Sequence, residues 1–291
     1  YVTMGELIAW IIGWALIMEY ALGAATVSIA WSEYLNKLLG GGIPYEWCHS
    51  PFETFTSSDG VLHTGIMNAP ALVILLALTL LLIKGTQESA FVNAIIVFIK
   101  VAIVLLFIAI GWQFIRPENY TPYVIPDGTA PVVDHAGKVI ADYSGWNKHG
   151  WGGVLGGAGI VFFAFIGFDA VSTAAQEAKN PKRDMPIGIL GSLVVCTVLY
   201  VLFSHVLTGV ANWEEFKTAG KEASVAYAIK TYMPGYEWLG TLVTIAILAG
   251  FSSVILVMLM GQSRVFYSMS KDGLVPKVFS ELHPKFRTPF K

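Results

Sequence analysis

The stretch that decides the fold is Phe162-Phe163-Ala164-Phe165-Ile166-Gly167-Phe168-Asp169-Ala170-Val171-Ser172-Thr173. It starts like the middle of a membrane-spanning helix, and then a glycine and an aspartate stand where hydrocarbon-facing residues should continue. Gly167 allows the backbone to leave helical geometry, and Asp169 can cap a fresh helix start. We therefore expect a discontinuous helix at about 153–178, made of two half-helices that meet inside the membrane.

Such a break predicts a binding site. Freed N–H and C=O groups find no partner in hydrocarbon, so irregular backbone is tolerated at this depth only where it is buried in protein or lines a cavity. The alternative is an ordinary span with a bend, whose aspartate lies near the membrane interface, because glycine is common in membrane helices.

Composition supports a membrane protein. Apolar residue types make up 55% of the 291 residues and charged types only 13%, too few charges for a water-soluble domain. We expect an all-α polytopic membrane protein with a single membrane domain over 1–291. Each of the following apolar windows can cross ~30 Å of hydrocarbon, which predicts six spans. The windows cover about 4–26, 69–83, 89–115, 153–175, 186–211 and 238–262.

The distribution of lysine and arginine predicts the orientation. One set of connections carries ten of these residues in about 43 positions, and the opposite set carries seven in about 104. The denser set should face the cytoplasm, which places both ends of the chain there, including a tail at 264–291. The segments 27–68, 116–151 and 212–237 are then outside. A net charge of −2 argues against nucleic acid as a partner.

Two ionisable residues lie deep inside predicted spans, where charge is expensive and usually functional. Lys100 stands halfway along its window, and desolvation there would let it gain and lose a proton in the physiological range. Glu19 is similarly deep and could accept a proton or contact a cation. The alternative is structural: the lysine reaches a water-filled crevice or pairs with Glu19 and only fixes the packing.

The last span carries two neighbouring hydroxyls, Ser252 and Ser253, which could face a cavity or bond back to their own helix. Glycines precede the break at 152, 153, 156, 157 and 159, where they allow close packing or leave room for a ligand. No catalytic or phosphate-binding motif and no metal-ligand spacing is present, and Cys48 and Cys196 do not suggest one. We predict neither an enzyme nor a bound cofactor or metal.

Three segments carry a family resemblance. The first comprises Phe165-Ile166-Gly167-Phe168-Asp169 and its continuation Glu177-Ala178-Lys179-Asn180-Pro181. The second is Arg264-Val265-Phe266-Tyr267-Ser268-Met269-Ser270-Lys271-Asp272-Gly273 and the third Gly5-Glu6-Leu7-Ile8-Ala9-Trp10. They resemble, in that order, the sixth span, the cytoplasmic motif after the eighth span, and the third span of amino acid permeases in the amino acid, polyamine and organocation superfamily. The third segment is similar to the cationic amino acid transporter branch and its bacterial relatives.

The resemblance implies an inverted-repeat fold of five plus five helices, of which this chain holds spans three to eight. Because the chain starts at Tyr1 directly before hydrophobic sequence, we expect it to be a fragment that lacks the family's first, unwound span. The family's substrate site implies roles for Phe165, Ile166, Gly167, Phe168 and Asp169, with Ser252 and Ser253 facing the site from the last span. Lys100 is similar to the lysine that replaces a sodium ion in proton-coupled members.

These features together predict secondary active transport in a cell membrane. The substrate would be an amino acid, cationic or small and neutral, carried with a proton across the lipid bilayer by alternating access. A sodium-coupled permease is the first alternative, although the Lys100 ammonium would repel sodium from the same space. The second is a channel or a receptor-like scaffold without alternating access, which would favour repeated polar positions along several spans.

Overall fold

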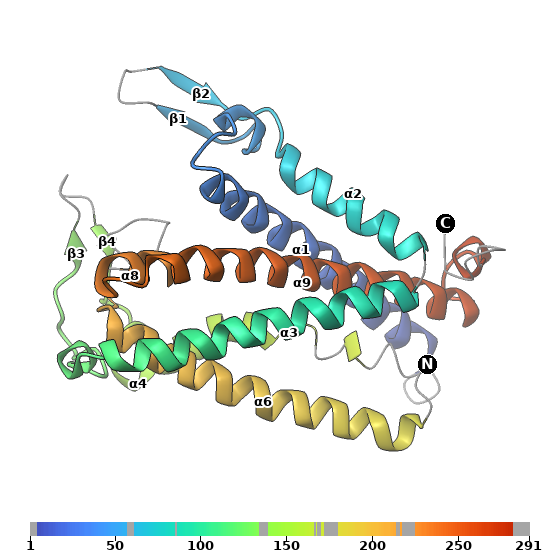
Figure 1. Cartoon of the computed structure of the whole chain (residues 1–291). Helices are drawn as coiled ribbons and strands as arrows, with labels where there is room; N and C mark the ends of the chain where they lie inside the picture. Colours follow the sequence, from blue (N-terminus) through green and yellow to red (C-terminus); the bar gives the residue numbers. More distant parts are fainter. Residues whose placement is uncertain are drawn as a thin grey trace. The chain divides into compact units, whose positions relative to one another are not determined.

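The computed structural model describes residues 5–56, 61–84, 86–133, 139–165, 167, 170–171, 180–213, 216 and 225–281. The longer helices are α1 (Glu6–Leu38), α2 (Ala69–Lys84), α3 (Thr86–Gly111), α4 (Gly150–Val161), α6 (Pro181–Val210) and α9 (Glu237–Lys271) (Figure 1). The short α8 (Val225–Tyr232) precedes α9. Each of the six apolar windows therefore overlaps one of the longer helices.

Four helical segments are long and apolar enough to cross a membrane within the described part of the chain. They are Glu6–Leu38, Asn93–Phe114, Pro181–Val210 and Glu237–Lys271, while Ala69–Ile83 and Gly150–Val161 are apolar but shorter. Some helices also extend beyond their apolar windows, since α1 continues to Leu38 and α9 to Lys271. Polar residues such as Glu, Asn and Lys are compatible with helix, so hydrophobicity marks the buried part of a span rather than its end.

Between the helices lie two short hairpins that composition did not indicate. Strands β1 (Thr54–Thr56) and β2 (Leu62–Thr64) pair antiparallel with Phe55 opposite His63, and β3 (Val132–Val133) pairs antiparallel with β4 (Val139–Ala141). Both lie in segments predicted to be outside the membrane. With strands of two or three residues, they are local features and leave the fold an all-helical one.

The chain forms two compact units. Unit 1 comprises Tyr1–Lys100, Asp169–Met185 and Thr244–Lys291, and unit 2 comprises Val101–Phe168 and Pro186–Val243. In unit 1, α1 packs beside α2 (Figure 1).

Helices α1 and α9 pack antiparallel in unit 1, with glycines on both sides of the interface. Gly23 lies opposite Met258, and the ring of Tyr20 lies 3.1 Å from where a Cβ at Gly261 would be. Further contacts between these helices are Gly13 with Met269, Trp14 with Phe266 and Tyr34 with Phe251. As residue numbers rise along α1 they fall along α9, and small residues allow this close approach of two spans.

In unit 2, the segment after α3 closes onto the end of α6 at one glycine. The backbone N–H of Arg116 and the side-chain amide of Asn119 both donate to the carbonyl of Gly209, at 2.9 and 2.8 Å. The hydroxyl of Tyr120 donates to the carbonyl of His205 at 2.8 Å, and the two rings stack 4.9 Å apart. His205 thus has the hydrogen-bonded, structural setting that is usual for a histidine at a span end.

Candidate functional site

The predicted helix break begins where α4 ends. After Val161 the chain tightens into the 3-10 helix η4 (Phe162–Phe165), and Gly167 then adopts a φ of +101°. That value lies in the region that residues with a Cβ avoid, so glycine is required for the chain to turn there. Ile166, Phe168 and Asp169, which the sequence placed at the site, lie outside the described residues.

A tyrosine of α6 supports the break in unit 2. The hydroxyl of Tyr200 donates to the carbonyl oxygen of Ala164 at 3.3 Å, and its ring meets that of Phe165 edge to face with centroids 5.5 Å apart. A carbonyl that leaves regular helical bonding inside a membrane needs such a partner. Sequence reasoning missed Tyr200, and a tyrosine in the middle of an apolar run was the available signal.

Lys100 and the last span meet in unit 1. Lys100 is half-buried on α3, and its Cδ lies 3.8 Å from where a Cβ at Gly250 of α9 would be. The stem of the lysine thus passes the backbone of α9 at a position without a side chain. A residue larger than alanine at Gly250 would have to displace this stem.

The two neighbouring serines of α9 use their hydroxyls differently. Ser252 donates back to the carbonyl of Leu248 in its own helix at 2.9 Å. Ser253, only 4% exposed, donates across to the side-chain oxygen of Asn93 on α3 at 2.5 Å. Ser252 thus bonds back to its own helix, one of the two possibilities left open by the sequence, whereas the bond of Ser253 to another helix was not among them. Sequence reasoning missed Asn93, although an amide seven residues before Lys100 is a polar signal on the same helix face.

Glu19 lies on α1, in the same unit as Lys100. It is half-buried on α1, and its neighbour Tyr20 packs at Gly261. Gly261 and Gly250 are eleven residues apart along α9, which corresponds to about 16 Å of helix. The register of α9 thus separates the level at which Tyr20 packs from the level at which the Lys100 stem passes.

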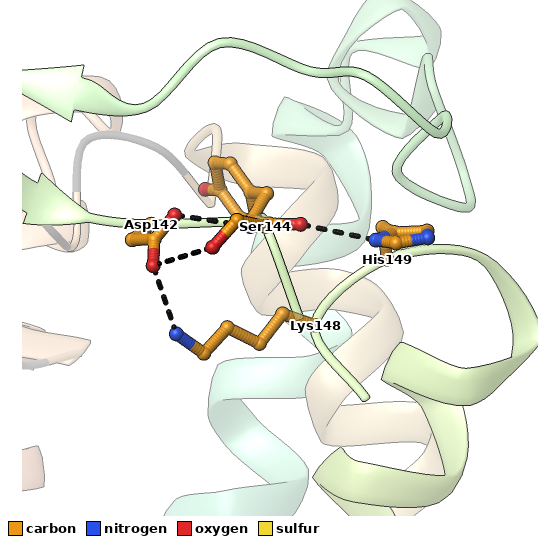
Figure 2. Close-up of polar contacts among 5 residues, drawn as sticks. Asp142, Ser144, Lys148 and His149 are labelled. Atoms are coloured by element: carbon orange, nitrogen blue, oxygen red, sulfur yellow. Dashed lines mark hydrogen bonds and ion pairs between the residues drawn. The ribbon is translucent and has the colours of Figure 1, made fainter. Parts of the chain in front are cut away.

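A polar cluster precedes α4 in unit 2 (Figure 2). The Asp142 carboxylate accepts hydrogen bonds from the backbone N–H and the hydroxyl of Ser144, at 3.0 and 2.9 Å, and from the Lys148 ammonium at 3.1 Å. These bonds, the backbone one first, lower the pKa of Asp142. They hold the segment that leads directly into the helix of the break.

His149 connects this segment to a preceding turn. Its Nδ1 lies 3.0 Å from the carbonyl of Tyr143 (Figure 2), and its Nε2 lies 3.2 Å from the carboxylate of Asp127. Both partners can only accept a hydrogen bond, so the ring makes both contacts only when it carries two protons. Both contacts of His149 before α4 therefore form together only with a doubly protonated ring.

Glycines let the segment approach α4 closely. A Cβ at Gly152 would collide with the carbonyl oxygen of Trp146, and a Cβ at Gly156 would lie 2.5 Å from the carbonyl oxygen of Asn147. Gly157 has no such neighbour within 4 Å among the described residues. Part of the glycine run therefore makes room for the preceding loop rather than for another helix.

Comparison with known proteins places the chain. A family model described as amino acid permease matches residues 1–291. The chain aligns in full with the branched-chain amino acid permease BcaP of Bacillus subtilis at 42% identity and with the methylthioribose transporter of that organism at 36%, covering 56% of each. It is 30% identical to human cationic amino acid transporter 4, over 99% of the chain and 41% of that protein.

The chain thus spans about half the length of the curated relatives it matches. Its apolar helices and the break after α4 agree with the predicted class of an all-α, multi-pass membrane protein, and a permease family agrees with the prediction that it is no enzyme. From the match along its whole length, the chain belongs to the amino acid permease family.

Proposed function

We propose that this chain is the membrane core of a secondary active transporter that takes up amino acids with protons by alternating access. The observation that carries the proposal is the family match over residues 1–291, on a chain whose α4 ends in a 3-10 turn and a left-handed glycine. A broken span of this kind is where transporters bind substrate, near the middle of the membrane.

The substrate would lie against the break. Phe165, Ile166, Gly167, Phe168 and Asp169 would form one wall, with aromatic rings enclosing the substrate and freed backbone groups facing its ammonium. The contact between Phe165 and Tyr200 supports this role, since it fixes the orientation of one aromatic ring.

Ser252 and Ser253 of the last span would also contact the substrate. Both hydroxyl hydrogens are already donated, to Leu248 and Asn93, so either serine would meet the substrate as a hydrogen-bond acceptor. An ammonium or a cationic side chain is the part of an amino acid that such an acceptor can bind.

Lys100 would carry the coupling proton. Its stem lies along Gly250 inside the helix bundle of unit 1, where the free energy of a charged ammonium depends strongly on its surroundings. Glu19 would be a second proton acceptor or a cation contact on α1. A sodium-coupled mechanism is the alternative, and the positive charge of Lys100 argues against it.

The relatives' names frame the substrate class. The relative with 42% identity is named for branched-chain amino acids, and the human relative with 30% identity for cationic ones. The higher identity supports a neutral branched-chain substrate, whereas a half-buried Glu19 supports a cationic one. We propose a six-span segment in a cell membrane with both ends in the cytoplasm, as the lysine and arginine distribution indicates.

The test uses the full-length protein in liposomes under an imposed pH gradient. Uptake of labelled leucine and arginine, each with the other as competitor, identifies the substrate. Lys100→Ala should abolish gradient-driven uptake, whereas Lys230→Ala, which removes an exposed lysine at the end of α8, should not. Uptake that needs sodium and ignores Lys100→Ala would refute the coupling mechanism.

A channel or a receptor-like scaffold gives a different result in the same liposomes. A carrier saturates with substrate and exchanges labelled internal substrate for unlabelled external substrate, because the same site faces each side in turn. Flux that rises linearly with concentration and shows no such exchange would refute alternating access.

A further inference from the structure

Within unit 1, a side-chain hydrogen bond joins α3, seven residues before Lys100, to α9. The hydroxyl of Ser253 donates to the side-chain oxygen of Asn93, and Ser253 is only 4% exposed. Asn93 and Lys100 are seven residues apart, so they lie on the same face of α3, about 10 Å apart along the axis. This face therefore meets α9 at two levels, once through the amide and once through the lysine stem.

The two levels agree with antiparallel packing. Asn93 meets Ser253 and Lys100 meets Gly250, so numbers rise along α3 while they fall along α9. The seven residues on α3 correspond to only three on α9 because long helical side chains lean toward the N-terminus of their helix. The Lys100 stem thus leans toward Asn93, and one interface holds both residues.

The bond is a specific choice of partner. A serine within a helix can donate to a carbonyl of the preceding turn, as Ser252 does to Leu248. Ser253 has a single hydroxyl hydrogen and donates it to Asn93 of α3 instead. An interhelical bond between buried side chains stabilises one register of two spans in an apolar environment, where few other polar contacts can do so.

We propose that Asn93 is a positioning residue for the proton-coupling lysine. Its bond to Ser253 fixes α3 against α9 on the predicted cytoplasmic side of Lys100 and so holds the lysine stem at Gly250. The inference rests on the proposed role of Lys100 in proton coupling. Asn93 itself contacts neither the proton nor the substrate, so its loss should change how uptake depends on pH and leave the KM for the amino acid unchanged.

The experiment is a double-mutant cycle in the full-length protein, reconstituted in liposomes with uptake normalised to inserted protein. Asn93→Ala, Ser253→Ala and the double variant should each lower maximal uptake about three- to twenty-fold, the range expected for one interhelical hydrogen bond. All three should shift the pH of half-maximal uptake by the same amount. The double variant should be no worse than either single one, because all three remove the same bond.

Two further variants separate positioning from folding. Ser263→Ala removes a hydroxyl of α9 that donates only within its own helix, to Met260 at 2.9 Å, and should behave like the wild type. The exchange of Asn93→Ser with Ser253→Asn restores a donor and an acceptor across the interface and should bring the pH profile back toward that of the wild type.

The outcomes distinguish this inference from the proposed function. Effects of Asn93→Ala and Ser253→Ala that add up, a raised KM in Asn93→Ala, or an unchanged pH profile in Asn93→Ala would overturn the positioning role. Wild-type uptake that ignores the pH gradient and Lys100→Ala would instead overturn proton coupling, whatever the Asn93 variants do.

Discussion

Replacing Gly156 of α4 by alanine tests whether the loop before this helix is packed on its glycine face. A Cβ at Gly156 would lie 2.5 Å from the carbonyl oxygen of Asn147, where ordinary contact begins at 3.4 Å, so the loop has to move by about 0.9 Å. Such overpacking costs about 1–3 kcal/mol. The helix recovers about 1 kcal/mol, because alanine favours helix over glycine.

Gly157→Ala is the matched control, since Gly157 has open space in the described part of the chain and gains the same helix preference. The two variants should therefore differ by about 1–3 kcal/mol, with Gly156→Ala the less stable. In the purified full-length protein this corresponds to an apparent melting temperature lower by about 2–10 °C. Equal melting temperatures would refute the close packing of residues 145–148 on α4.

Two further predictions concern the segment before α4 and the end of α6. Asp142 has a lowered pKa, so the stability it contributes is present above the pKa of an unfolded aspartate, about 4, and disappears as the pH falls through its folded value. Asp142→Asn should therefore raise the rate of amide hydrogen exchange at Ser144 at neutral pH and remove this acid dependence. An unchanged exchange rate would contradict the prediction. A Cβ at Gly209 would collide with the hydroxyl of Tyr120, so Gly209→Ala should lower the free energy of unfolding by about 1–3 kcal/mol. Gly191→Ala on the same helix should not, because a Cβ there meets none of the described residues within 4 Å. Thermal unfolding of both variants checks this, and equal melting temperatures would contradict it.

The break after α4 shows what a local sequence signal can and cannot predict. A glycine flanked by phenylalanines inside an apolar run indicates lost helical geometry, and Gly167 has a positive φ. The support from Tyr200 could not be predicted, because it depends on how α6 packs against η4, and 36 residues separate Tyr200 from Ala164. Proximity of that kind is a property of tertiary packing.

The same holds for the polar residues of the spans. Lys100 and the two serines were noticeable because polar groups are rare in apolar helices. Whether each serine would bond to its own helix or across to another depended on helical phase, and adjacent serines took opposite roles. The role of Asn93 as the hydrogen-bond partner of Ser253 could be recognised only from the structure, because it depends on how α3 packs against α9.

The amino-acid sequence by itself determined the class of this protein, the positions of its apolar helices and the place where one of them breaks. These features follow from local chemistry: hydrocarbon excludes charge and unpaired backbone groups, and glycine alone adopts certain dihedral angles freely. Only the tertiary structure decided which glycines face a loop, which hydroxyl joins two spans and which residue lies beside Lys100. Those contacts depend on the register and rotation of packed helices, and a shift of one residue turns a side chain by about 100° around its helix.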